Sequence, residues 1–125
     1  MGQMETLLGK GLMSFSRDWR MTEKDLLRSV RDMARLLGWQ TYHTHTSRFS
    51  EPGFPDLVLL RGSRLIFAEL KVGKGKLRQG AVNRHGRVWP GQAWWLENLA
   101  QAAGVATYLW RDTDWASGEI EVALR

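Results

Sequence analysis

The chain of 125 residues contains no cysteine. Without thiols it can form neither a disulfide nor a thiolate metal site, so any metal must be held by oxygen or imidazole ligands. No run approaches the roughly 18 apolar residues of a membrane span, and the first residues lack the pattern of a secretion signal. We therefore expect a soluble, cytoplasmic protein that is not secreted and has no membrane contact.

Acidic residues are absent from one long segment, between Glu69 and Glu97. The basic residues that fall there are Lys71, Lys74, Lys76, Arg78, Arg84 and Arg87. Over the whole chain, 18 Lys and Arg against 13 Asp and Glu give a net charge of +5. Such a balance favours a polyanionic partner, and the basic segment predicts where that partner binds.

The length and the hydrophobic fraction of 43% suffice for one modest core and hence for a single domain. Residues 1–20 show no sustained periodicity, and we interpret them as an N-terminal extension of unknown role. The folded domain is predicted over residues 21–125.

A helix is predicted to start at Thr22, a good N-cap, because Glu23 and Asp25 suit the positive end of a helix dipole. Gly38 is suited to end it. Its apolar face is formed by residues at helical spacing, namely Leu26, Leu27, Val30, Met33, Ala34 and Leu37. A short strand over 39–44 and a polar loop over 46–55 follow.

Two apolar runs then flank Gly62-Ser63, a pair that suits a type II′ hairpin turn. Both strands are apolar on both faces, as expected for strands covered by helices on each side. Residues 72–91 form a Gly-rich basic loop. A helix is predicted to begin at Pro90 and to end at Gly104, with a buried face of Trp95, Leu96, Leu99, Ala102 and Ala103.

A further strand is predicted over 105–110, and the tail over 114–125 fits either a short helix or an edge strand. The element order is helix, strand, hairpin, helix, strand. It predicts an α/β fold in which helices flank a mixed sheet.

The predicted hairpin carries the main functional signal, because a two-residue turn places Asp56 directly opposite Glu69. Like charges there destabilise a sheet unless something compensates them, and Mg²⁺ or Mn²⁺ would do so. Strand alternation puts Lys71 on the same face as Glu69. A cation could activate water for phosphodiester hydrolysis, while the ammonium orients that water or stabilises the developing charge.

Gly53-Phe-Pro-Asp-Leu57 followed by Ala68-Glu-Leu-Lys71 resembles the PD-(D/E)xK nuclease superfamily, and specifically the virus-type replication-repair nuclease (VRR-NUC) family. The resemblance runs from about residue 21 to about residue 124. It implies a restriction-endonuclease-like fold with Asp56 and Glu69 as metal ligands and Lys71 as the catalytic lysine. It also implies that Glu23 joins the metal site and that Gln92 contributes to catalysis. The segment 77–91 is longer than the connector of that family, so the resemblance implies nothing about its role.

Several of these residues also fit simpler interpretations. Glu23 is explained equally well by the helix dipole, and Gln92 by the need for polar partners in a first helical turn. His43 and His45 fit a half-exposed strand pair better than a metal site.

The loops offer candidate contacts to a phosphate backbone. Ser47 and Arg48 could touch the scissile phosphate, and Lys74, Lys76, Arg78, Arg84 and Arg87 could bind the DNA backbone. The stretch Gly73-Lys74-Gly75-Lys76 lacks the spacing and the terminal Ser or Thr of a P-loop, so no nucleotide cofactor is expected.

The sequence therefore predicts a Mg²⁺- or Mn²⁺-dependent DNA endonuclease that selects branched DNA, with four-way (Holliday) junctions as the favoured substrate. One alternative is a less selective nuclease or nickase that acts on flaps, ends or foreign DNA. Another is a nuclease-derived DNA-binding module without catalysis. A two-fold symmetric homodimer is expected, with Trp94 on an exposed helical face as a contact.

Overall fold

The computed structural model describes residues 20–44 and 51–125. Within these ranges the elements are, in order, α1 (Glu23–Leu36), β1 (Gln40–His43), β2 (Leu57–Arg61), β3 (Arg64–Lys71), β4 (Ala81–Val82), β5 (Val88–Trp89), α2 (Gln92–Leu99), β6 (Val105–Arg111), α3 (Asp112–Ser117) and α4 (Glu119–Leu124).

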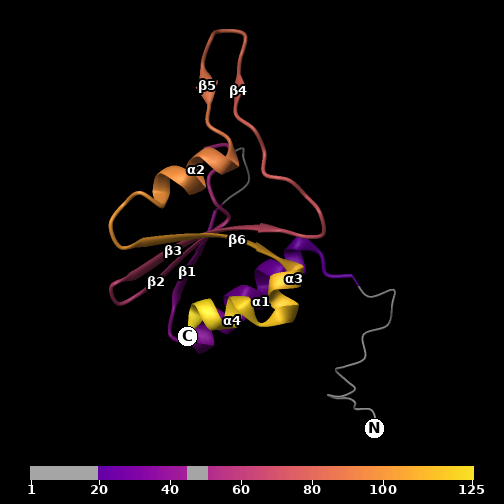
Figure 1. Cartoon of the computed structure of the whole chain (residues 1–125), viewed down its shortest axis with the longest axis vertical. Helices are drawn as coiled ribbons and strands as arrows, with labels where there is room; N and C mark the ends of the chain where they lie inside the picture. The colour runs from indigo at the N-terminus through magenta and orange to yellow at the C-terminus, as the bar shows by residue number, and fades with distance from the viewer. Residues whose placement is uncertain (1–19, 45–50) are drawn as a thin grey trace.

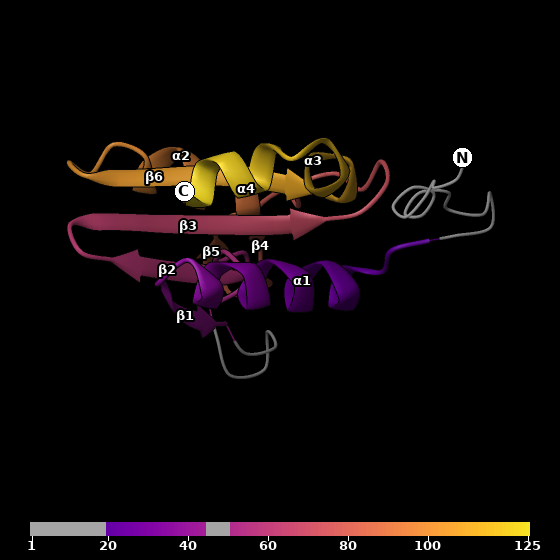
Figure 2. The ribbon, with the colours of Figure 1, turned by 90° about the horizontal axis from the view of Figure 1, so that it is seen from below.

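The main sheet has the strand order β1-β2-β3-β6. The pairs β1–β2 and β2–β3 are antiparallel, whereas β3 and β6 are parallel. Helices α1, α3 and α4 lie on one side of this sheet and α2 on the other (Figures 1 and 2). The predicted α/β fold, a mixed sheet flanked by helices in one small domain, is therefore confirmed.

Helix α1 begins as its sequence predicts. The backbone N–H of Asp25 donates to Thr22 Oγ1 at 3.0 Å, and the N–H of Thr22 donates to Asp25 Oδ2 at 3.1 Å. This reciprocal pair satisfies two N–H groups that the first turn leaves without helical partners. At the other end Gly38 has φ 92, a left-handed conformation that costs glycine little free energy because it has no side chain. Both predicted ends of the helix are confirmed.

The hairpin of β2 and β3 has the predicted register, with Leu57 paired to Ala68 and Arg61 to Arg64. Gly62 has φ 59 and Ser63 a negative φ, the combination of signs that a type II′ turn requires. Asp56 directly precedes β2, so continuing the register places it across from Glu69. This pairing brings the predicted carboxylates to one end of the hairpin.

The core lies between the sheet and the helices α1 and α4. Alternate residues of β2 and β3 face it, and fully buried side chains of both helices pack on them. The buried apolar members are Leu26, Val30, Ala34, Trp39, Leu57, Leu59, Ile66, Ala68, Leu70, Trp110, Ile120 and Leu124. This packing fixes the start of β2, which Asp56 precedes, and the end of β3, which contains Glu69 and Lys71.

The opposite face of the sheet is covered less completely than its apolar sequence predicts. Phe54 packs edge-on against both Phe67 and Trp95, with ring centroids 5.8 Å and 5.0 Å apart. Leu60, nearer the hairpin turn, is 48% exposed. The prediction that helices cover both faces of the strands thus holds near the carboxylates and is wrong at the turn.

Three other local predictions needed correction or resolution. Helix α2 begins at Gln92 with Gly91 as N-cap, not at Pro90, and it ends at Leu99. Because the chain then leaves the helix, Ala102 and Ala103 are exposed rather than buried. The tail forms two short helices, since Ile120 and Leu124 are needed in the core.

No helix among the described residues is both long and apolar enough to span a membrane.

The segment 72–91 is more ordered than the loop that its composition predicts. Strands β4 and β5 pair antiparallel, with Ala81 opposite Trp89 and Val82 opposite Val88. Together with their turn they form a narrow hairpin that projects away from the sheet on the side of α2 (Figure 1). We call residues 80–91 the arm.

Candidate active site

Asp56 is held at the end of β2 by contacts on both sides. Its Oδ2 accepts a hydrogen bond from the backbone N–H of Leu70 at 2.9 Å. Its carbonyl oxygen accepts from the N–H of Thr44 at 2.9 Å, and the Thr44 hydroxyl donates to the carbonyl of Pro55 at 2.6 Å. One carboxylate of the predicted pair is therefore oriented by the backbone of the neighbouring strand.

Glu69, the second carboxylate, is only 2% exposed. Its Oε2 accepts a hydrogen bond from Gln92 Nε2 at 2.7 Å and lies 4.0 Å from Lys71 Nζ. Its Oε1 is buried and has no hydrogen-bond partner. Leaving a buried oxygen without a partner costs free energy, so this atom is suited to an incoming cation or donor.

Gln92 connects Glu69 to the chain that leads into the arm. While its Nε2 donates to Glu69, its Oε1 accepts from the backbone N–H of Arg78 at 2.6 Å. The side chain is 8% exposed, so water competes little for these bonds. The two contacts fix the amide orientation and hold one oxygen of Glu69 in place.

The electrostatics of the pair favour a bound cation. Burial, followed by the negative charge of Asp56, raises the pKa of Glu69 to about 8, although Lys71 opposes the shift. In the absence of a cation, Glu69 would hold a proton at neutral pH. A divalent ion between the two carboxylates would replace that proton and relieve the repulsion, so these residues fit a hard metal.

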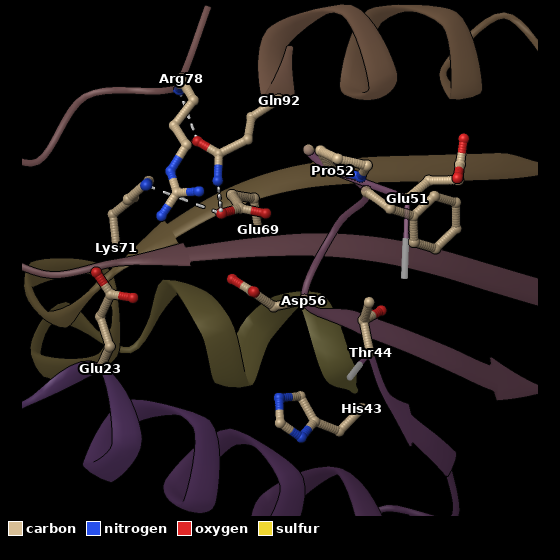
Figure 3. Close-up of a pocket in the computed structure, with 12 residues that line it drawn as sticks. Glu23, His43, Thr44, Glu51, Pro52, Asp56, Glu69, Lys71, Arg78 and Gln92 are labelled. Atoms are coloured by element: carbon tan, nitrogen blue, oxygen red, sulfur yellow. Dashed lines mark hydrogen bonds and ion pairs between the residues drawn. The ribbon is translucent and has the colours of Figure 1, made fainter. Parts of the chain in front are cut away.

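These groups face one open pocket (Figure 3). The Asp56 and Glu23 carboxylates point toward the space beside Glu69 and Lys71, and the Arg78 side chain extends into it from above (Figure 3). The residues that line the pocket are Glu23, His43, Thr44, Glu51, Pro52, Gly53, Phe54, Asp56, Glu69, Lys71, Arg78 and Gln92.

The predicted three-carboxylate set is not preassembled. Across residues 20–44 and 51–125, no group of three acidic or imidazole side chains is close enough to hold a metal ion. Glu23 nevertheless lines the pocket, and its charge contributes to the raised pKa of Glu69. Its role as a third ligand stays a prediction.

The other predicted residues are placed unevenly. His43 lines the pocket from β1, whereas His45, Ser47 and Arg48 lie outside the described residues. The remaining predicted DNA contacts are all exposed: Lys74, Lys76, Arg78, Arg84 and Arg87. Of these, only Arg78 lines the pocket.

Two polar lining residues were not expected from the sequence. Thr44 orients the chain around Asp56 through two hydrogen bonds, and Glu51 adds another carboxylate to the rim. The one signal that could have indicated Glu51 is its position in the sequence, because it is an acidic residue shortly before Gly53-Phe-Pro-Asp56. Nothing in the spacing around Thr44 marked it, because its role depends on the pairing of β1 with β2.

The raised pKa of Glu69 predicts how stability varies with pH. A carboxyl with a folded pKa of about 8 and an ordinary value of 4.5 stabilises the fold fully below the lower value. That contribution is lost as pH rises through the higher one, by up to about 1.4 kcal/mol per pH unit. Metal-free protein should therefore melt at lower temperature as pH rises from 5 to 8, in the window set by the pKa of Glu69.

The matched variant is Glu69→Gln, which keeps an acceptor for Gln92 and cannot ionise. Its melting temperature should change less over the same window, and the difference between the two curves reports Glu69 alone. Parallel curves would show that this carboxyl has no raised pKa. Added Mn²⁺ should stabilise wild type most at high pH, where it no longer competes with a proton.

A comparison of the sequence with protein-family models and with characterised proteins finds no match. Among solved structures, a likeness is found to Hjc, a Holliday junction resolvase from the archaeal hyperthermophile Archaeoglobus fulgidus, with a TM-score of 0.43 and 20% sequence identity. The match covers 72% of this chain and 63% of that one, so the chain spans less than two thirds of the structure that it resembles. Membership of the VRR-NUC family stays a prediction.

Proposed function

We propose that this chain is a Mg²⁺- or Mn²⁺-dependent endonuclease that hydrolyses DNA phosphodiester bonds. The observation that carries the proposal is the buried Glu69, which lines an open pocket together with Asp56 and Lys71. Its Oε1 has no hydrogen-bond partner, and its pKa is raised. A buried carboxylate that faces a second, partly exposed one, with an adjacent ammonium, is costly for a structural site, and it is suited to a metal and a phosphate.

The residues divide the chemistry among them. Asp56 and Glu69 would hold the cation, which when bound supplies Lewis acidity and activates water. Lys71 would orient the attacking water or stabilise the charge that grows on the phosphoryl oxygens. Gln92 is a positioning residue, because it contacts Glu69 and the backbone of Arg78 rather than the reacting atoms. Glu23 would join from the start of α1.

The favoured substrate is branched DNA, four-way junctions above all, as the sequence resemblance implies. A panel of labelled junction, flap, nicked and linear DNA, each with Mg²⁺, Mn²⁺ or EDTA, tests this choice. Paired cuts confined to the junction support it. Equal cutting of all forms would support the less selective nuclease, and binding without cleavage under every condition would support the DNA-binding module.

The active form is proposed to be a homodimer, because two symmetric cuts call for two related sites. Trp94 is 47% exposed, and its ring stands perpendicular to that of Trp95 with centroids 5.2 Å apart. Exposed tryptophans supported by a neighbouring ring suit the centre of an interface.

Sedimentation at low micromolar concentration is therefore expected to report a dimer that Trp94→Ala weakens by about tenfold or more, as expected for a contact worth at least 1.4 kcal/mol. The control is Val122→Ala, which removes an apolar side chain that is 71% exposed on α4. A wild-type monomer that cuts junctions at full rate would refute the symmetric arrangement. Dimerisation that is intact while single-strand binding falls would instead make Trp94 a platform for an unpaired base.

A further inference from the structure

The arm is a built structure whose role neither the proposed chemistry nor the family resemblance accounts for. Its turn is closed by Asn83, whose backbone N–H donates to the carbonyl of Arg87 at 2.9 Å. The Asn83 Oδ1 accepts from the N–H groups of His85 and Arg87, both at 2.9 Å. Gly86 takes the left-handed conformation, with φ 80, that this turn requires. The Gly86 N–H also donates to the carbonyl of Asn83 at 2.9 Å, and a tip held by these four bonds presents its side chains in a defined direction.

The surface of the arm combines cations with exposed apolar side chains. Val82 and Val88 are directly paired across the two strands and are 66% and 65% exposed. On the other face the Arg87 guanidinium stacks on the Trp89 ring, 4.1 Å from its centroid, and Arg84 stands at the tip. No acidic residue occurs anywhere in the arm. Such a surface has no partner within the described part of the chain.

The base of the arm is fixed against the site. A Cβ on Gly91 would lie 2.5 Å from the carbonyl oxygen of Arg78, and one on Gly80 would lie 2.7 Å from that of Trp89. The two backbone segments at the base of the arm therefore cross in direct contact, and a residue larger than glycine at position 80 or 91 would not permit this crossing. Gly53, in the loop that leads to Asp56, approaches Pro90 equally closely.

The same crossing is tied to Glu69 by hydrogen bonds through Gln92. The backbone N–H of Gln92 donates to the carbonyl of Arg78 at 3.0 Å, while its side chain bonds Glu69. The direction of the arm is thus set by residues that also orient the metal site. Anything bound along the arm is held in a fixed relation to Glu69.

We infer that the arm enters the major groove of duplex DNA and so positions the strand that Glu69 and Asp56 act on. A two-stranded ribbon, with strands about 4.8 Å apart, fits a major groove about 12 Å wide, and the minor groove of about 6 Å is too narrow. The cations suit the phosphates along the rims, and the paired valines suit the apolar edges of bases such as the thymine methyl group. The inference rests on DNA being the partner of the proposed enzyme.

A second copy of this chain is the competing occupant, because a projecting hairpin can also pack between subunits. Charge decides against it: two arms that meet around a two-fold axis would bring Arg84 and Arg87 of each copy together, with no acid in either arm. DNA supplies the opposite charge along the whole length of the arm. We therefore commit to duplex DNA.

Removing the two tip cations provides the first test. With Arg84→Ala and Arg87→Ala combined, the slope of log affinity against log salt for a linear duplex should become shallower by about two, because each lost phosphate contact contributes about 0.9. The control removes two exposed arginines from α1 on the far side of the sheet, Arg28→Ala and Arg35→Ala. An equal change in both pairs, or in neither, would overturn the inference.

The absence of native cysteine makes a sharper test available. A benzophenone attached to His85→Cys at the tip should photo-crosslink to duplex DNA, whereas one on Leu36→Cys, an exposed position at the end of α1, should not. The reaction is run in EDTA, so its result does not depend on cleavage and separates this inference from the proposed activity. Crosslinks to a second protein chain in place of DNA would overturn it.

The choice of groove is tested with duplex DNA whose cytosines carry glucosylated hydroxymethyl groups, which fill the major groove. Wild type should bind this DNA at least about tenfold more weakly than the unmodified duplex, a difference of 1.4 kcal/mol. The variant with both Arg84→Ala and Arg87→Ala should discriminate less. Equal binding of the two DNAs by wild type would show that the arm does not enter the major groove.

Discussion

Replacing Asp56 is expected to abolish DNA cleavage while the fold is retained. This side chain has two roles: its charge would bind the cation, and its Oδ2 accepts a hydrogen bond from the N–H of Leu70. Two substitutions separate them. Asp56→Asn keeps an oxygen for that bond and removes the charge that a cation requires. Asp56→Ala removes both, so the metal-free variant should lose stability by about 1–3 kcal/mol, because the Leu70 N–H loses this acceptor.

Activity should fall to the background rate in both variants, measured as single-turnover cleavage of a labelled junction with saturating Mn²⁺. Thermal melting in EDTA reports stability separately. The matched control is Asp32→Asn, which removes the charge of an exposed acid on α1 and should leave cleavage unchanged. Full activity in Asp56→Ala would remove this residue from the site.

Replacing Lys71 is expected to reduce the cleavage rate by about 10²- to 10³-fold, the usual effect of losing one donor that stabilises a transition state. The ammonium lies 4.0 Å from Glu69 Oε2, and Lys71 lines the pocket but is only 9% exposed, so little water reaches it. Its loss should change DNA affinity much less than turnover. Lys71→Met is the preferred variant, because it keeps an unbranched apolar stem in the space that Lys71 fills.

Lys74 provides the opposite signature, since it is exposed three residues further along the chain. Lys74→Ala should weaken DNA binding in a salt-dependent manner and leave the single-turnover rate at saturating DNA nearly unchanged. Rates and binding constants measured for both variants would distinguish the roles. If binding and turnover fall in parallel for Lys71→Met, Lys71 serves only as a phosphate anchor.

The hairpin that carries the carboxylates could be predicted because its information is local. Gly62-Ser63 selects a two-residue turn, the turn sets the register, and the register places Asp56 across from Glu69. The start of α1 was equally accessible, since the bonds between Thr22 and Asp25 depend on residues three apart. Features encoded within a few residues needed no knowledge of the rest of the fold.

The arm could not be predicted from the same signals. Its strands are only two residues long and show no alternation, and Gly and Arg dominate the flanking sequence. What orders it is the backbone crossing of Gly80 and Gly91, together with the bonds of Gln92 to Arg78 and Glu69. These contacts join segments that are distant in sequence, and spacing along the chain does not reveal them.

The site was predicted in composition more fully than in arrangement. The face shared by Glu69 and Lys71 follows from strand alternation, whereas the hydrogen bond of Glu69 Oε2 to Gln92 depends on how α2 packs on the sheet. Gln92 was singled out by the family resemblance, yet its second bond, to Arg78, depends on the path of the chain that leads into the arm. Burial and partners are properties of the assembled layers.

The central claim is that Asp56 and Glu69 hold a divalent cation for DNA hydrolysis. It is tested most directly by titrating Mn²⁺ into metal-free wild type and Glu69→Gln and measuring junction cleavage at each concentration. We predict saturable cleavage by wild type that EDTA reverses, and none by Glu69→Gln at any Mn²⁺ concentration. Cleavage by wild type in EDTA, or equal cleavage by the two proteins, would contradict the account.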